Sequence, residues 1–429
     1  MSVRVSRLEN GLRVVTDTMP HLRTAALGVW VEAGSRSETA EQNGITHLLE
    51  HMAFKGTAKR SASQIAEEIE AVGGELNAAT SVEHTNYHAR VLAEDVPLAV
   101  ELIADILQHS TFDAQELARE KHVILQEIGA AHDTPDDKVF DQFQETAWAN
   151  QSIGRPILGT RDTVMSFTPD DLRGYLARHY RADSMILSAA GAVDHDTMVE
   201  LARAHFADLP SAPSPALAPA RYTGGTGRLE RDLMEVQLVL GFEGQPYKAA
   251  DYYAIQVLAS VMGGGMSSRL FQEIRERRGL CYAIYAFHWA FRDTGVFAIH
   301  AATGEEDIDE LFPVLVDEVH AAAERIAQAD LDRAKAQIRA GLMMSLESPA
   351  ARAGQIARQM MIHDHVLSLD EIQTRIDAVT LDCLRRVAGK TFGGAPTLST
   401  VGPAGVRLTA EDVAARLDPP TGAARAVGA

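Results

Sequence analysis

The sequence contains very little cysteine. Only Cys281 and Cys383 occur among its 429 residues, which excludes a disulfide framework and a thiolate zinc cluster. A reducing compartment is the simplest setting for such a chain. The first twenty residues have neither a secretory h-region nor the composition of a transit peptide. We therefore expect a bacterial cytoplasmic protein, in preference to the mature form of a mitochondrial-matrix protein.

Long apolar runs and an excess of positive charge are also missing. No run approaches the roughly 18 apolar residues that a membrane-spanning helix needs, so we expect no membrane span. The 59 acidic residues outnumber the 40 basic ones, for a formal charge of −19, and this balance argues against a nucleic-acid partner. The acidic charge is compatible with a cavity for basic peptides, but an ordinary acidic surface is the simpler interpretation.

The chain does have the length of two domains and a break in composition near its middle. Residues 209–227, LPSAPSPALAPARYTGGTG, are rich in proline, alanine and glycine and nearly free of charge, which is typical of an extended linker. We expect an N-terminal domain over 1–208 and a homologous C-terminal domain over 228–429. Both are expected to be α+β, each a β-sheet with helices packed on one face.

The two halves show the same order of expected elements. In the first half these are a strand over 24–34, helices over 43–56 and 61–74, a strand over 77–91, and helices over 94–107 and 113–130. The second half repeats this order, and ELAREKHVILQEI aligns with DLDRAKAQIRAGL without a gap at an offset of 214 residues. Such self-similarity predicts an internal duplication.

The helix expected over 43–56, NGITHLLEHMAFKG, contains the pattern H-x-x-E-H in His47, Glu50 and His51. The two histidines are one turn apart on one helix face, where two imidazoles can bind one zinc ion at roughly 2.0–2.1 Å. Glu50 is displaced by about 100° around the axis and can reach a metal-bound water as a general base. Asn43 is expected to cap the helix. The alternative is a core helix with two half-buried histidines and a surface glutamate.

A catalytic zinc site needs a third protein ligand and an open position for water. The helix over 113–130 offers Glu120 and Glu127, which lie on one stripe about 10.5 Å apart along the axis, so both cannot easily bind the same ion. One should bind the metal and the other orient a ligand histidine, but the residues alone do not decide between them. Either glutamate could instead pair with a basic neighbour. At the offset of 214, His47, Glu50, His51 and Glu127 correspond to residues without metal-binding side chains, namely Val261, Gly264, Gly265 and Gly341.

These motifs form an ordered set that resembles a known family. The stretches that carry the resemblance are GITHLLEHMAFKGT, GGELNAATSVEHTNYHARV, REKHVILQEIGAAHDTPDD and GGGMSSRLFQEIRERRGLCYAIYAF. They are similar to the M16-type inverted-zincin metallopeptidases of the pitrilysin and insulin-degrading group. The resemblance is strongest to the β-subunit of mitochondrial processing peptidase and its bacterial homologues, and it covers nearly the whole chain.

The resemblance implies a zinc-dependent endopeptidase that binds one zinc ion per chain. It assigns the metal to His47, His51 and Glu127, and it makes Glu50 the base that activates the zinc-bound water. It assigns Glu120 to the support of a ligand histidine. The choice between the two glutamates of the long helix therefore comes from the family pattern.

The family also binds its substrate as an added strand, at an edge that here reads LNAATS. Asn77 and Ala78 are therefore expected to flank an extended peptide. An arginine and a tyrosine of the family's C-terminal half correspond to Arg275 and Tyr282. Arg275 could hold a substrate carbonyl or carboxylate, and Tyr282 could donate to the tetrahedral oxyanion. The alternative for Arg275 is membership of a solvated basic cluster.

Members of this family work as two two-domain units around a closed chamber, which suits unstructured peptides or presequence-like segments. This chain supplies one unit with both motifs, so we expect a homodimer, or a heterodimer with a homologous subunit, in which Arg275 and Tyr282 act in cis or in trans. One alternative is a non-catalytic assembly subunit of the same superfamily, against which the complete zinc set argues. Another is a metal enzyme of a different class, such as the S-ribosylhomocysteine lyases, which are short single-domain chains.

Overall fold

The computed structural model describes residues 2–212 and 214–417. The chain divides into two compact units, each assembled from three segments. The first comprises Met1–Ala130, Arg155–Ala218 and Leu342–Leu367, and the second comprises Ala131–Gly154, Pro219–Gly341 and Ser368–Ala429. One change of unit, after Ala218, falls in the proline-rich segment 209–227. The other changes of unit are not marked by the composition of the sequence.

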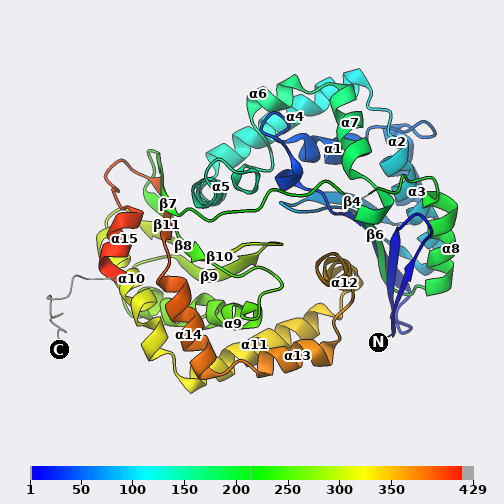
Figure 1. Ribbon diagram of the computed structural model, residues 1–429. Helices are drawn as coiled ribbons and strands as arrows, with labels where there is room; N and C mark the ends of the chain where they lie inside the picture. The colour runs from blue at the N-terminus through cyan, green and yellow to red at the C-terminus, as the bar shows by residue number, and fades with distance from the viewer. Residues whose placement is uncertain (1, 213, 418–429) are drawn as a thin grey trace. The chain divides into compact units, whose positions relative to one another are not determined.

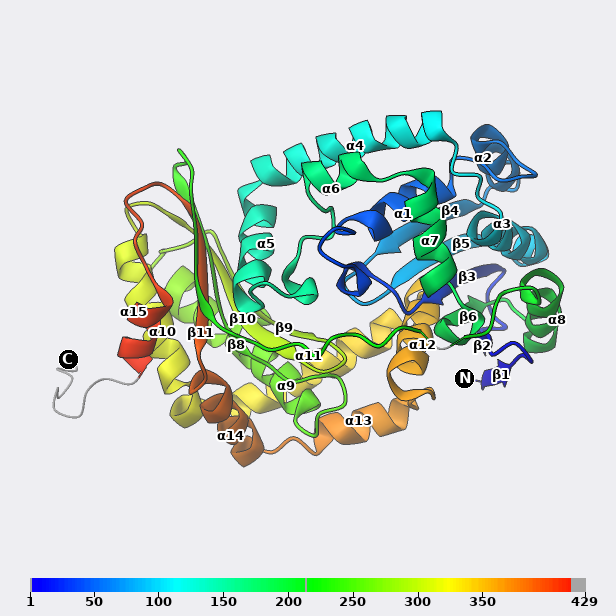
Figure 2. The ribbon, with the colours of Figure 1, turned by 45° about the horizontal axis from the view of Figure 1, so that its top comes forward.

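The first unit (Figure 1) contains a six-stranded sheet of order β1-β2-β6-β3-β5-β4, whose strands are labelled in Figure 2. Its strands are β1 (Ser2–Arg7), β2 (Arg13–Thr18), β3 (Thr24–Val31), β4 (Glu75–Thr80), β5 (Thr85–Leu92) and β6 (Met185–Gly191). β2 and β6 are parallel, whereas all other neighbours are antiparallel. Among the described residues β4 pairs only with β5, so its other edge is free.

The segment 77–91 differs from the sequence prediction. Its alternating pattern predicts one strand, but the structure has a hairpin in which β4 and β5 are antiparallel. The Ser81 amide donates to the His84 carbonyl at 2.8 Å and closes the turn. The turn contains no glycine, proline, asparagine or aspartate, and of the residues that usually mark a reversal of the chain it has only Ser81. The local signal for a turn was therefore weak.

Helices cover both faces of the first sheet. On one face, α3 (Val96–Gln108) and α8 (His195–Phe206) share a core with Val14 of β2. On the other face, α12 (Pro349–His363) packs on β2, β3 and β6, where it contacts Val15. Adjacent residues of a strand point to opposite faces of the sheet. Val14 belongs to the core under α3 and α8, whereas Val15 belongs to the core under α12, so α12 covers the second face (Figure 2). The sequence analysis placed helices on one face only.

A buried ion pair joins α12 to the sheet. Arg352 Nε donates to Asp17 Oδ2 at 2.6 Å, and the two side chains are only 3% and 0% exposed. Ser188 Oγ donates to the Ala353 carbonyl at 2.8 Å beside this pair. Removing one partner of such a pair leaves an uncompensated buried charge, so these contacts fix the helix to this sheet.

The second unit contains a five-stranded sheet of order β7-β11-β8-β10-β9. Its strands are β7 (Gly225–Glu230), β8 (Glu235–Glu243), β9 (Ala283–Ala290), β10 (Gly295–Gly304) and β11 (Pro396–Gly402). β7 and β11 are parallel and the other neighbours are antiparallel. This is the order and direction of β2-β6-β3-β5-β4 in the first unit, as expected of a duplicated chain.

The two halves of the sequence exchange a helix. α5 (Pro135–Ala147) comes from the first half but packs on β7, β8 and β11 of the second unit, with Phe143 against Gly241. α12 comes from the second half and packs on the first sheet. α4 (Ala114–Asp133) and α5 begin 214 residues before α11 (Gln328–Ser345) and α12. α5 and α12 are thus equivalent helices that have changed places.

The remaining helices complete the two units. Those of the first half are α1 (Ile45–Ala53), α2 (Ala62–Ala71), α6 (Arg161–Ser166) and α7 (Pro169–His179). Those of the second half are α9 (Tyr252–Gly263), α10 (Ile308–Arg325), α13 (Leu369–Asp377), α14 (Leu381–Phe392) and α15 (Ala410–Leu417). Within the described ranges, none of the helices has the length and apolar character that crossing a bilayer requires.

Candidate metal centre

Helix α1 places the two histidines of the H-x-x-E-H motif side by side. Leu48, Leu49 and Met52 are buried in the core of the first unit, which fixes the rotation of the helix about its axis. The side chains of His47 and His51 are 12% and 17% exposed. Their ring centroids are 4.7 Å apart, so both imidazoles face the same small volume.

The start of α1 differs from the sequence prediction. Asn43 is not the capping residue, because the N-cap is Gly44 and makes no side-chain capping bond. Instead, the carboxylate of Glu38 accepts from the amides of Gly44 and Thr46, each at 2.9 Å. Burial raises the pKa of Glu38 to about 7, although these hydrogen bonds oppose the shift. The sequence analysis missed Glu38, because it precedes the helix by more residues than a capping box allows.

Helix α4 brings a third donor atom to the two imidazoles. Glu127 Oε2 lies 3.6 Å from His47 Nε2 and 3.5 Å from His51 Nε2. This oxygen is buried and has no hydrogen-bond partner among the described residues. Donor atoms around a tetrahedral zinc ion with bonds of about 2.0–2.1 Å lie about 3.3 Å apart. The spacing and the unpartnered oxygen therefore fit one metal ion bound by these three residues.

The three residues form a distinct group in the part of the chain that the structure describes. One ligand atom of each lies within 4.8 Å of the other two, and no second cluster of this kind is found in those ranges. The side chain of Glu127 is 40% exposed, which leaves an approach to the centre from solvent. Three protein donors and one open side are the arrangement of a catalytic zinc site.

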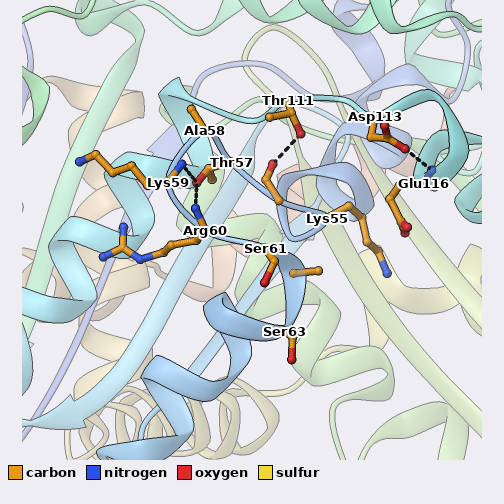
Figure 3. A pocket seen from close by; sticks show the side chains of 12 residues that line it. Lys55, Thr57, Ala58, Lys59, Arg60, Ser61, Ser63, Thr111, Asp113 and Glu116 are labelled. Carbon is orange, nitrogen blue, oxygen red and sulfur yellow. Dashed lines mark hydrogen bonds between the residues drawn. The ribbon is translucent and has the colours of Figure 1, made fainter.

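Glu120 binds the far side of one imidazole. Its Oε2 lies 3.0 Å from His51 Nδ1, and its Oε1 lies 2.7 Å from Lys55 Nζ. Burial acts to raise the pKa of Glu120, but the hydrogen bonds from Lys55 and His51 outweigh it and lower that pKa. The carboxylate thus keeps the proton of His51 on Nδ1 and leaves Nε2 free for a metal. Figure 3 shows Lys55 at the end of α1, lining a pocket with Glu116.

His47 is a neutral imidazole at physiological pH. Burial, together with the neighbouring His51, lowers the pKa of His47 to about 4. Neutral imidazole is the form that binds metal ions. His47 Nδ1 is buried without a hydrogen-bond partner among the described residues, so this histidine has no counterpart of Glu120.

Glu50 lies on α1 outside the group of three and faces β5. Burial raises the pKa of Tyr87 and Tyr180, and the negative charge of Glu50 adds to both shifts. Burial lowers the pKa of His88, and Glu50 opposes that shift. A half-buried carboxylate beside the donor group, but not part of it, fits a general base better than a ligand.

The free edge of β4 lies next to this helix. Asn77 and Ala78 are paired with His88 and Tyr87 of β5, and α1 contacts β4. The Asn77 side chain accepts from the Ala78 amide at 2.8 Å, whereas Ala78 itself is buried. A pocket beside the edge is lined by both apolar and polar side chains, among them Phe54, Ile65, Ile69, Leu76, Asn77 and His88.

Arg275 and Tyr282 belong to the second unit. Arg275 lies on a π-helix, Phe271–Glu276, with its Cζ 4.8 Å from the Phe271 ring centroid and 5.6 Å from that of Tyr282. Arg277 and Arg278 differ from it, because both pair with Glu273. Tyr282 is 84% exposed. Such π-helical turns occur frequently at functional sites, and this one presents a cation and a phenol together.

Comparisons with known proteins bear on both units. Residues 13–161 match the family model for insulinase, peptidase family M16, and residues 166–338 match that for the peptidase M16 inactive domain. An uncharacterized zinc protease of Rickettsia felis is 40% identical over 404 residues, covering 94% of this chain and 98% of its own. The probable mitochondrial-processing peptidase subunit beta of Arabidopsis thaliana is 37% identical over 415 residues, covering 93% and 78%. The crystal structure of a protease from Helicobacter pylori shares the fold, with a TM-score of 0.86 at 24% identity and coverage of 94% and 100%.

The contact between Glu120 and His51 predicts a specific loss of metal affinity. Glu120→Gln keeps the size of the side chain but weakens its hydrogen bonds to His51 and Lys55. We expect zinc to bind about 10–100-fold more weakly, as for other partners of metal-binding histidines. Competition with a chromophoric chelator measures the zinc Kd. Glu116→Gln, on the same helix, is the control and should leave the Kd unchanged; equal affinity in both variants would contradict the assignment.

Proposed function

This chain belongs to the M16, or insulinase, family of zinc metallopeptidases, and we propose that it is an endopeptidase with one zinc ion held by His47, His51 and Glu127. One observation carries the proposal. Glu127 Oε2 is buried without a hydrogen-bond partner and faces Nε2 of both histidines at 3.5–3.6 Å. A carboxylate oxygen beside two imidazole nitrogens is a donor set that suits zinc.

Hydrolysis needs a proton acceptor beside the metal and firmly held ligands. Zinc bound in such a site acidifies water and polarises the scissile carbonyl. Glu50 takes the proton from the attacking water and then donates it to the leaving amine. Glu120 and Lys55 hold the His51 ring in place during these steps. The chain's own residues thus supply orientation and both proton transfers.

The substrate proposed for this site is an extended peptide added to the sheet at β4. The edge of β4 is free among the described residues, and α1 contacts the same strand. An added strand gains main-chain hydrogen bonds whatever its sequence, while a pocket beside the edge selects side chains. Only an unfolded segment can adopt this conformation, which favours unstructured peptides or presequence-like segments. The name of the Arabidopsis relative, a processing peptidase, supports the second of these.

We further propose that the second unit completes the site of a partner chain in a closed homodimeric chamber. Arg275 would hold a substrate carbonyl or carboxylate, and Tyr282 would donate to the oxyanion of the tetrahedral intermediate. The 84% exposure of Tyr282 supports a side chain that serves a site outside its own unit. A heterodimer with a homologous subunit is the alternative assembly.

A non-catalytic role for the whole chain is less well supported. The family description with the word inactive matches residues 166–338, and none of the three proposed ligands lies in that range. The first family model spans 13–161, which contains the complete ligand group and Glu50. The word inactive therefore describes a part of the chain without the proposed ligands, and a non-catalytic subunit would have no need to keep the ligand group intact.

The role of Glu50 can be separated from metal binding. Glu50→Gln should lower kcat for an unstructured peptide by about 10²–10⁴-fold, the usual contribution of a general base, with one zinc ion still bound. Mass spectrometry of the products and elemental analysis of the protein measure the two quantities. Glu67→Gln, an exposed glutamate on α2, is the control. Full activity of the Glu50→Gln variant would exclude Glu50 as the base. A wild-type protein that binds no zinc would contradict the proposed function itself.

Strand addition predicts an alternating effect of substrate N-methylation. A methyl group on an amide that faces β4 removes one main-chain hydrogen bond and should raise KM by about 2–10-fold. Methylation of the intervening amides, which point away from the sheet, should leave KM unchanged and provides the internal control. Steady-state kinetics on a methyl-scanned peptide make the measurement. A uniform effect along the peptide would rule out binding at a sheet edge.

Mixed dimers test whether the second unit acts in trans. A Glu50→Gln chain and an Arg275→Ala chain are each expected to be inactive alone. If each second unit serves its partner, one composite site per mixed dimer is intact, and random mixing should restore about a quarter of wild-type activity. Native mass spectrometry verifies that mixed dimers form. Mixed dimers without activity would show that Arg275 acts in cis.

A further inference from the structure

Glu38 is a buried carboxylate at the start of the helix that carries both histidines. Only 3% of this residue is exposed. Its oxygens accept from the amides of Gly44 and Thr46 at 2.9 Å, and Asn43 Nδ2 donates to Oε2 at 3.2 Å. Since Gly44 offers no side chain, the oxygens of Glu38 take the role of an N-cap and satisfy amides at the start of the helix.

The two histidines are supported in different ways. His51 Nδ1 lies 3.0 Å from Glu120, whereas His47 Nδ1 is buried with no hydrogen-bond partner in the described ranges. A metal-binding histidine usually has such a partner, which fixes the ring. The position of His47 therefore depends on the backbone of α1. His47 directly follows Thr46, whose amide is bound by Glu38.

Glu38 also ties the start of α1 to the segment 155–159. Arg155 Nη2 donates to the Glu38 carbonyl at 2.5 Å, and Asn43 Nδ2 donates to the Pro156 carbonyl at 2.9 Å. Gly44 has a φ of 94°, and a Cβ there would lie 2.8 Å from Gly159 Cα. These contacts hold the loop before α1 in place, and with it the Glu38 carboxylate against the first turn of the helix.

From this geometry we propose that Glu38 is a positioning residue of the metal centre, which keeps His47 Nε2 directed at Glu127 Oε2 by fixing the first turn of α1. The inference rests on the zinc site proposed above. Replacement by glutamine would set a side-chain N–H₂ against the helix amides, or leave one amide without an acceptor. The first turn would then shift with His47, while His51 would stay bound to Glu120.

Zinc affinity and the cobalt spectrum of Glu38→Gln test this proposal. We expect the zinc Kd to rise about tenfold or more, in the range seen for other supporting residues, and the visible absorption of the cobalt-substituted protein to change. Asp105→Asn is the matched control, because Asp105 is equally buried and accepts from Thr57 and Arg60 away from the start of α1. It should lower the thermal midpoint of the zinc-free protein and leave Kd and spectrum unchanged.

The results for the Glu38 variant either support or overturn its role as a positioning residue. If Glu38→Gln loses only thermal stability and keeps the wild-type Kd and spectrum, the carboxylate is a structural support and the inference is overturned. If that variant does not fold, Asn43→Ala, which removes one of the three donors to Glu38, takes its place. Weaker zinc binding in it supports the inference, and unchanged binding overturns it. A wild-type protein without zinc affinity would overturn the proposed function and this inference together.

Discussion

The contact between α1 and α4 is the interaction on which the chemistry of the first unit depends. The candidate metal ligands come from both helices, so their donor atoms meet only if the two helices keep one relative position. The chain of hydrogen bonds from Lys55 through Glu120 to His51 joins these same helices. Because Glu120 is only 8% exposed on its side chain, water competes little for these bonds. The hydrogen bonds that hold His51 in place thus also link the two helices that carry the candidate ligands.

The residue pattern predicted the candidate metal ligands, but it did not predict all of the residues that hold those ligands in place. The spacing of His47 and His51 places them on one helix face in any α-helix, and the structure brings both to Glu127. The residues alone did not decide whether Glu120 or Glu127 binds the metal, because both lie on one stripe of α4. Their different partners follow from which side chains of α1 each glutamate meets, which helical periodicity does not encode. Glu38 was missed for a related reason, since it reaches the helix through an irregular loop.

The fold was predictable to a similar depth. The order of the expected elements and the offset of 214 residues predicted two similar halves. In the structure, the five strands of the second sheet repeat the order of β2-β6-β3-β5-β4 in the first. The hairpin between β4 and β5 was not predicted, because Ser81 is a weak turn signal and the turn has no glycine, proline, asparagine or aspartate. The exchange of α5 and α12 was missed because an amphipathic pattern shows that a helix has an apolar face. It does not show which sheet that face covers.

The exchange of α5 and α12 also determines when the first unit can be completed during synthesis. When the first half of the chain has left the ribosome, the faces of β2, β3 and β6 that α12 will cover still expose Val15, Trp30 and Ile186. Asp17 then lacks Arg352, its partner 335 residues later. Domains generally fold as units from the N-terminus during synthesis, but the first unit can be completed only after nearly the whole chain has been translated. This late closure leaves an apolar sheet face uncovered while the second half is being synthesised, and such exposed surface is prone to aggregation.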